Sequence, residues 1–291
     1  MQHATFSLYS AAYDALKARR RCALSNIFQD RESLEQLLTQ KDCLLFPTEG
    51  CLFLFVPFHG VCHDCLYLAA DIPALENGLT SCLAHAELPA PVRVSVIGKE
   101  PLAGMQTRVF QHQGFTLRKE LLRTRLKKPD PRIIEAMRAL AGNALLKEIS
   151  FAVAGEEEEI LAMLLSEFDI VGDNLPELAT IREDIAKRHI AVLRRNGRIA
   201  SLHYFQRHRN TLHALYDVTR KEFRREQMFT AISLFVLDTF EKEEGKPVRA
   251  FGWRDISKKR LVRHARKNDQ EMDGVHIYNL LYPSTVTYRE K

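Results

Sequence analysis

The chain has no long apolar run and no recognisable export signal. No stretch approaches the roughly 18 consecutive apolar residues of a membrane helix, and the first 20 residues lack the apolar core and small-residue cleavage site of a secretion signal. These absences argue against a membrane protein and against a secreted one. We therefore expect a cytoplasmic protein with no membrane partner.

Cysteine is absent from the chain beyond Cys82, and all six cysteines lie before that point. Cys62-x-x-Cys65, followed by Cys82-x-x-His85, has the spacing of a four-ligand zinc site. However, Leu66 continues a strand pattern where a zinc knuckle usually turns, and Cys82 and His85 lie in an amphipathic segment. We favour buried packing over a zinc site and expect no metal.

The composition is that of a globular chain with room for two ordinary domains. It has 291 residues, of which 46% are hydrophobic and 27% charged, and a formal net charge of +5. This mildly basic balance favours anionic small molecules, and it lies far below the charge density of a dedicated nucleic-acid binder.

Hydrophobic periodicity predicts the same order of elements twice. In the first half, the expected order is two helices, a hairpin, a strand, a helix, a strand, a helix and final strands: 13–20, 33–40, 43–46, 51–56, 66–70, 71–86, 92–97, 102–113, 115–117 and 121–126. The second half follows this order: 151–153, 156–168, 189–193, 199–205, 211–218, 224–242, 248–253, 257–267 and 275–281. Its clearest element is the hairpin around Asn196-Gly197, which suits a type I′ turn.

This repetition predicts an α/β (α+β) fold of two tandem units, each a mixed, mostly antiparallel sheet flanked by helices. The proline-marked stretch Lys127-Lys128-Pro129-Asp130-Pro131 separates them. We expect a first unit over 1–127, a linker helix within 128–147 and a second unit over 148–291.

The segment Phe110-Gln111-His112-Gln113-Gly114-Phe115 closes a helix and opens a strand. Together with the tandem layout, it resembles the GCN5-related N-acetyltransferase (GNAT) superfamily over about residues 5–126 and 148–285. Many members read Tyr-x-x-x-Gly-Phe at this place. Here Phe110 stands for the tyrosine and has no hydroxyl to donate a proton.

The resemblance implies a coenzyme A site at the start of the helix over 224–242. The pyrophosphate loop of the family, Arg-x-x-Gly-x-Gly/Ala, falls there, with Gln227 and Phe229 in place of the usual glycines. A helix start still offers unpaired amide donors and a positive dipole end. The residues implied to bind acetyl-CoA or another acyl-CoA are Val218, Arg224, Arg225, Glu226, Gln227, Met228, Phe229, Thr230 and Ala231.

In the family, a gap between the fourth and fifth strands receives the pantetheine arm, which pairs with the fourth strand. The resemblance places these strands at 214–218 and 248–253 in the second unit, and at 65–70 and 92–97 in the first. In the first unit, Asp71-Ile72-Pro73-Ala74 puts an acid where phosphate would lie. We therefore expect a degenerate first unit and an active second one.

Transfer of an acyl group to an amine needs a base for the amine and an acid for the leaving thiolate. Aligning the last helix of the second unit on the tyrosine of the family places His264 there, and histidine titrates near neutrality. Tyr216 and Asp217, at the end of the fourth strand, are the competing catalytic candidates. The expected acceptor is a small-molecule amine.

Two other functions remain open. Residues 249–267 carry eight lysines and arginines against one acid, Asp255, which fits an anionic acceptor or an RNA backbone. Fem-type aminoacyltransferases, which are also tandem and use aminoacyl-tRNA, are therefore one alternative. The other is a non-catalytic binding module with the GNAT fold, because both the loop glycines and the tyrosine are missing.

Overall fold

The computed structural model describes residues 2–19, 24–85, 91–126, 131–224, 226, 228–258 and 270–283. The chain forms two compact units. Unit 1 comprises Met1–Glu120 and Val275–Lys291, and unit 2 comprises Leu121–Gly274. Among the helices described, none is both long enough and apolar enough to cross a membrane.

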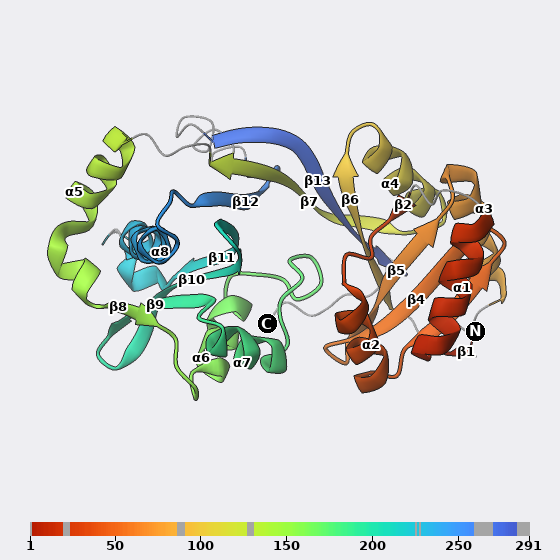
Figure 1. Cartoon of the computed structure of the whole chain (residues 1–291), viewed down its shortest axis with the longest axis horizontal. Helices are drawn as coiled ribbons and strands as arrows, with labels where there is room; N and C mark the ends of the chain where they lie inside the picture. Colours follow the sequence, from red (N-terminus) through yellow and green to blue (C-terminus); the bar gives the residue numbers. More distant parts are fainter. Residues whose placement is uncertain are drawn as a thin grey trace. The chain divides into compact units, whose positions relative to one another are not determined.

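Unit 1 is a sheet with the strand order β1-β3-β4-β5-β6-β13 and helices on both faces (Figure 1). Its strands are β1 (Gln2–His3), β2 (Leu24–Ser25), β3 (Leu44–Thr48), β4 (Cys51–Phe58), β5 (Cys62–Ala69), β6 (Val92–Lys99) and the later part of β13 (Gln270–Tyr282). Along that order only β5 and β6 are parallel. The β3–β4 turn uses Gly50 at φ +94°, a conformation that favours glycine.

The helices of unit 1 are α1 (Phe6–Arg19), α2 (Arg31–Gln40), α3 (Ile72–His85) and α4 (Leu102–His112). Two clusters of buried side chains form the core. One joins α1 and α2 to one face of the sheet through residues such as Tyr9, Leu34 and Leu54. The other joins α3 and α4 to the opposite face through residues such as Leu79 and Phe110.

Unit 2 repeats this plan with the strand order β7-β12-β11-β10-β9-β8, in which only β11 and β12 are parallel. Its strands are the later part of β7 (Thr116–Leu126), β8 (Ile149–Phe151), β9 (Ile190–Arg195), β10 (Arg198–His208), β11 (Thr211–Thr219) and β12 (Arg249–Asp255). As expected, Asn196 and Gly197 form the β9–β10 turn with positive φ angles.

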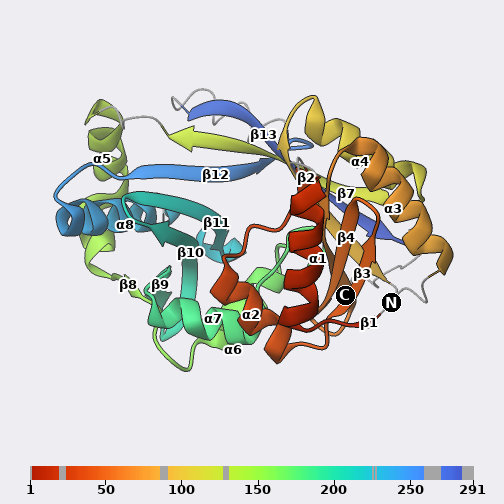
Figure 2. The same ribbon diagram turned by 45° about the vertical axis from the view of Figure 1, so that its right-hand side comes forward.

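The helices of unit 2 are α5 (Pro131–Lys147), α6 (Glu157–Leu165), α7 (Leu178–Ala186) and α8 (Met228–Glu244). Figure 2 shows α8 on one face of strands β9–β11 and α6 and α7 on the other. The expected linker helix is α5, which is part of unit 2 because its Leu145 and Leu146 pack on the cluster formed with α8.

Strands β7 and β13 each pass from one unit into the other. Residues Leu121–Leu126 of β7 pair with β12 in unit 2. The segment from Val275 to Tyr282 of β13 instead pairs with β6 in unit 1. The units therefore do not coincide with the expected segments 1–127, 128–147 and 148–291. Local alternation predicts a strand at each place but carries no information about its partner.

Element boundaries also differ near the expected coenzyme loop. Helix α8 begins at Met228 rather than at Arg224, because a 3₁₀ turn over Lys221–Phe223 precedes it. The expected helix over 257–267 lies almost entirely outside the described residues. Helix α7, between α6 and β9, was not expected from the sequence.

The strand exchange makes a testable prediction about Leu280. This side chain lies in β13, near the end of the chain, but is fully buried in the unit 1 cluster with Val94 and Phe110. Leu280→Ala should destabilise unit 1 by about 2–5 kcal/mol through loss of apolar contacts and the cavity left behind. Hydrogen exchange should show lost amide protection in β6.

The matched control is Leu234→Ala, which empties an equally buried position in the unit 2 cluster beneath α8. It should lower protection in α8 and β10 and leave β6 protected. If Leu280→Ala lowered protection only in unit 2, the assignment of β13 to the unit 1 sheet would be wrong.

Candidate functional site

The candidate site in unit 2 is a gap between the two parallel strands β11 and β12. They pair over only four residues, from Thr211 with Arg249 to Ala214 with Gly252. Beyond that point β11 continues to Thr219 and β12 to Asp255 without pairing to each other. The strands therefore part beside Val218, as the resemblance implied.

A β-bulge lies where the gap opens. On the other edge of β11, the pairing with β10 shifts between Tyr204–Tyr216 and Phe205–Ala214, so Leu215 is an extra residue. A bulge increases local twist and bends the strand that carries it. This bend gives a physical reason for β11 to turn away from β12 directly after Ala214.

The start of α8 follows β11 after the 3₁₀ turn and provides amide donors near the open end of the gap. Among the implied coenzyme residues, Met228 and Ala231 are buried in the core beneath the helix. Phe229 is 41% exposed, and its ring meets that of His203 edge-on at 6.1 Å. Arg225 and Gln227 lie outside the described residues.

The other implied coenzyme residues have varied surroundings. Arg224 forms an ion pair with Glu167 and donates to the Thr219 carbonyl oxygen, so its guanidinium is already partnered. Glu226 is exposed, and Val218 is buried against the α6–α7 face. Thr230 follows Phe229 in the first turn of α8 and is half-buried.

Asp217 is paired with His203 of β10, a residue that no sequence pattern singled out. The two lie directly opposite each other, and Nδ1 of His203 hydrogen-bonds the Asp217 carboxylate. A carboxylate oxygen accepts, so Nδ1 donates this bond and Nε2 is the ring nitrogen that does not contact Asp217. The two residues meet because of the register between β10 and β11. The bulge at Leu215 shifts this register by one residue, so the pairing cannot be predicted from the sequence alone.

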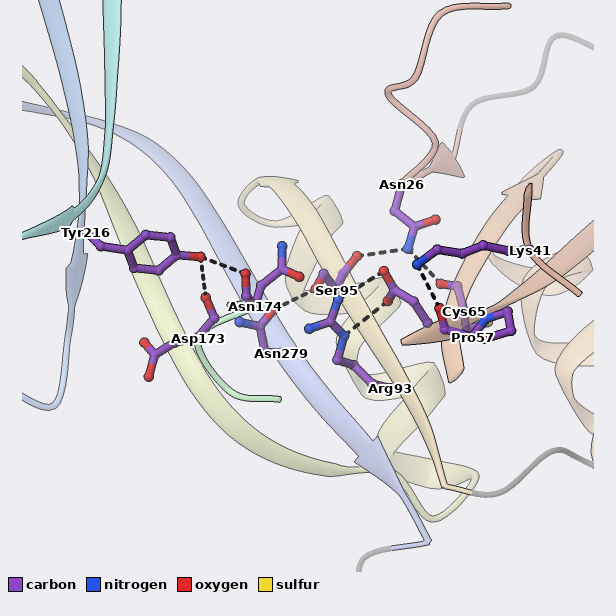
Figure 3. Close-up of polar contacts among 11 residues, drawn as sticks. Asn26, Lys41, Pro57, Cys65, Arg93, Ser95, Asp173, Asn174, Tyr216 and Asn279 are labelled. Atoms are coloured by element: carbon purple, nitrogen blue, oxygen red, sulfur yellow. Dashed lines mark hydrogen bonds and ion pairs between the residues drawn. The ribbon is translucent and has the colours of Figure 1, made fainter. Parts of the chain in front are cut away.

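Tyr216 points to the opposite face of the sheet. Its hydroxyl donates to the carbonyl oxygens of Asp173 and Asn174, at 3.1 and 2.6 Å (Figure 3). This arrangement attaches the loop between α6 and α7 to β11, which favours a structural role for Tyr216 over a proton donor. The third catalytic candidate, His264, lies outside the described residues.

The equivalent gap of unit 1 is filled by the chain itself. Strands β5 and β6 pair only at His63–Val92 and Asp64–Arg93 and then separate. Strand β2 enters this space and pairs with β5, with Leu24 opposite Ala69 and Ser25 opposite Leu68. A segment of protein thus lies where the family places the pantetheine arm.

Asn26, directly after β2, connects both walls of that gap. Its side-chain amide donates to the carbonyl oxygens of Cys65 in β5 and Ser95 in β6, at 2.9 and 3.1 Å (Figure 3). Its side-chain oxygen accepts from the backbone N–H of Tyr67 at 2.7 Å. Asn26 is only 5% exposed, so these bonds seal the gap from inside.

The start of α3 in unit 1 is also unsuited to phosphate. The Asp71 carboxylate accepts from the backbone N–H of Ala74 at 2.8 Å, and Pro73 has no N–H. A cavity beside this helix start is lined by Glu49 as well as Asp71. Two carboxylates, Glu49 and Asp71, therefore lie beside the start of this helix.

The zinc alternative fails on strand geometry. Cys62 and Cys65 both lie in β5, three residues apart, so their side chains point to opposite faces of the sheet. Cys65 and Cys82 are in the apolar cluster, where burial raises the pKa of the Cys82 thiol to about 12. Within the described ranges, no group of three or more potential ligands is placed to hold a metal ion.

The fold matches solved GNAT structures. A tandem GNAT protein from the clavulanic acid biosynthesis pathway superimposes with a TM-score of 0.57 at 11% identity, covering 96% of each chain. A GCN5-related N-acetyltransferase from Sphaerobacter thermophilus gives 0.53 at 12% identity, covering 87% of this chain and 85% of that one. No protein-family model and no curated protein sequence matches the chain.

A third similar structure is a GCN5-related glucosamine N-acetyltransferase region in a fungal multi-domain GH3 beta-N-acetylglucosaminidase. It gives a TM-score of 0.57 at 11% identity and covers 94% of this chain but 36% of the other. The chain therefore has a tandem GNAT fold, as the resemblance predicted. At identities of 11–12%, this likeness establishes the fold alone.

The filled gap in unit 1 predicts the effect of changing Asn26. Asn26→Ala should destabilise the protein by about 1–3 kcal/mol, because the buried amide of Tyr67 and the two carbonyl oxygens lose their partner. Chemical denaturation with a probe of unit 1 measures this loss. Asn77→Ala, at an exposed position on α3, is the control and should change stability little. Equal stability of wild type and Asn26→Ala would contradict the role assigned to Asn26.

Proposed function

We propose that this chain is an acyl-CoA-dependent N-acyltransferase whose site lies in unit 2. The observation that carries this proposal is the gap between β11 and β12, which opens at a bulge and leads to the start of α8. Unit 1 has the same architecture, but β2 and Asn26 fill its gap. Of the two units, unit 2 is the one whose geometry fits a pantetheine arm.

The stretch of β11 beyond Ala214, which does not pair with β12, provides backbone groups for the amides of the pantetheine arm, in the manner of an added strand. The start of α8 provides amide donors and a positive dipole end for the pyrophosphate. Phe229 does not block this fit, because its side chain is exposed and lies against His203. With the phosphates at α8, the thioester end of the arm lies toward Ala214, where the strands meet.

In the reaction, the amine nitrogen of the acceptor attacks the thioester carbonyl carbon. A C–N bond forms, the C–S bond breaks, the amine loses a proton and the leaving thiolate gains one. We assign the proton acceptor to His203 held by Asp217, because Asp217 lies on the part of β11 that borders the gap and His203 contacts it from β10. Asp217 fixes the imidazole and balances the charge that it gains.

Two of the similar solved structures support an N-acyltransferase function. The Sphaerobacter protein is described as an N-acetyltransferase, and the fungal region as a glucosamine N-acetyltransferase. Both descriptions are consistent with an amine acceptor and an acetyl-CoA donor for this chain. The competing aminoacyl-tRNA route depends on the eight cations of residues 249–267, five of which, from Lys259 to Lys267, lie outside the described residues.

The proposed coenzyme site can be tested at Phe229, the second residue of α8. Phe229→Glu should weaken acyl-CoA binding by at least about tenfold, because a carboxylate would face the phosphates at the helix start. Phe229→Gly should maintain or tighten binding, since glycine allows close approach to the backbone. Isothermal titration calorimetry with acetyl-CoA measures both effects and should give one bound molecule per chain.

Pro73 is the matched control, because it is the exposed second residue of α3 in unit 1. Pro73→Glu should leave the affinity for acetyl-CoA unchanged. Two bound molecules per chain, or weaker binding in Pro73→Glu alone, would place a coenzyme site in unit 1.

The alternative functions can be separated by thermal stabilisation of the protein. Stabilisation by total tRNA and none by acyl-CoA would favour the aminoacyl route, and stabilisation by neither would favour a non-catalytic module.

The proposed proton acceptor, His203, can be tested by substitution. His203→Gln should lower kcat by about 100-fold or more while acetyl-CoA binding is retained, because a positioned base contributes a factor of this order. Asp217→Asn should lower kcat as well and change the pH dependence of the rate. Tyr216→Phe is the control, and it should mainly affect stability because its hydroxyl holds the 173–174 backbone. A His203→Gln variant with full kcat would exclude this assignment.

A further inference from the structure

Unit 2 carries a second group of polar side chains on the sheet face opposite α8. Leu212 packs in the cluster beneath α8, so its neighbour His213 points to the other face. In the register of the sheet, His213 of β11 lies beside Phe251 of β12, and Phe251 lies beside Arg125 of β7. Arg123, two residues before Arg125, shares this face.

Phe251 is the centre of this group. The guanidinium carbons of Arg123 and Arg125 lie 5.2 and 5.6 Å from the centroid of its ring. The His213 ring stacks on it at 5.3 Å and 27°. We call Arg123, Arg125, His213 and Phe251 the arginine cluster. Stacking on an aromatic ring fixes a guanidinium plane and leaves its N–H edges available to an anion.

The two arginines differ in their partners. Arg123 forms an ion pair with Asp273 at 2.6 Å. Arg125 has no carboxylate partner among the described residues, and its Nε is buried without a hydrogen-bond partner. A buried donor without an acceptor is costly and rare in native proteins, and it marks a place where an acceptor is missing. Burial and the nearby charge of Arg123 lower the pKa of His213, which disfavours its protonated form.

The position of the cluster excludes the coenzyme phosphates as that acceptor. His213 lies six residues before Thr219, the last residue of β11, so it is about 20 Å along the strand from the end that leads to α8. The cluster lies instead where β11 and β12 are still paired, next to the point where the gap begins. This is the end of the gap assigned above to the thioester and the incoming amine.

We propose that the arginine cluster binds an anionic group, a carboxylate or a phosphate, on the amine acceptor. Arg125 supplies the charge-assisted hydrogen bonds, and its guanidinium lies over the ring of Phe251. The inference rests on the proposed acyltransferase function and adds the substrate class. Since His203 and Asp217 face α8 and the cluster faces the other way, the amine would reach the proton acceptor through the opening between the strands.

The test compares amines that differ only in charge. Thermal stabilisation of the full-length protein is measured at constant ionic strength with β-alanine against β-alaninamide, and with phosphoethanolamine against ethanolamine. Each pair is measured with and without acetyl-CoA. We expect the anionic member of at least one pair to stabilise the wild type and its neutral partner not to do so. The preferred pair distinguishes carboxylate from phosphate.

Arg125→Gln should abolish this stabilisation, and Arg125→Lys should retain part of it, because lysine keeps the charge but loses the planar fork. The loss corresponds to at least about a tenfold weaker apparent affinity. Arg198→Gln, at an exposed arginine beside the β9–β10 turn, is the control and should behave as the wild type. Stabilisation of Arg125→Gln by anionic amines equal to the wild type, or no preference of the wild type for either anionic amine, would overturn the proposal.

Acetyl-CoA alone separates this proposal from the proposed function. Acetyl-CoA should stabilise the wild type, Arg125→Gln and Arg198→Gln equally, because the cluster is far along β11 from α8. If acetyl-CoA stabilised none of them, the acyltransferase function would fail whatever the amines did. If it stabilised all of them and the amines showed no charge preference, the acceptor class alone would be wrong.

Discussion

The parting of two parallel strands after Ala214 and Gly252 is the constraint on which the interpretation of unit 2 depends. Strands that separate leave backbone N–H and C=O groups that must be paired by something else. A ligand with amide groups of its own can supply these partners, which is how a strand edge becomes a binding site. The bulge at Leu215 fixes where the separation begins and therefore where the thioester end of such a ligand would lie.

Unit 1 meets the same constraint in a different way. Its strands β5 and β6 separate after Asp64 and Arg93, and the unpaired groups are satisfied by β2 and by the side chain of Asn26. At the neighbouring helix start, the Asp71 carboxylate accepts from an amide that phosphate would otherwise use. Two copies of one architecture thus differ in what fills the gap, and this difference supports the proposal that unit 2 binds the ligand.

Each unit contains a strand that begins in the other unit. The β7 strand starts in unit 1 and ends as the edge partner of β12, whereas β13 ends as the partner of β6. Because Tyr278 and Leu280 fill the unit 1 core, that unit is incomplete without the last part of the chain. The arginine cluster depends on the same exchange, since Arg123 and Arg125 reach β12 only through β7.

The sequence by itself predicted the element order, the Asn196-Gly197 hairpin and, through the resemblance of its motifs and layout, the tandem GNAT fold. The element order and the hairpin follow from local patterns, because periodicity and turn residues act over a few positions. Only the tertiary structure decided that β13 completes unit 1, that Asn26 seals its gap, and that His203 meets Asp217. These facts are pairings between distant segments, set by register, by a bulge and by packing, and a local pattern cannot name a distant partner.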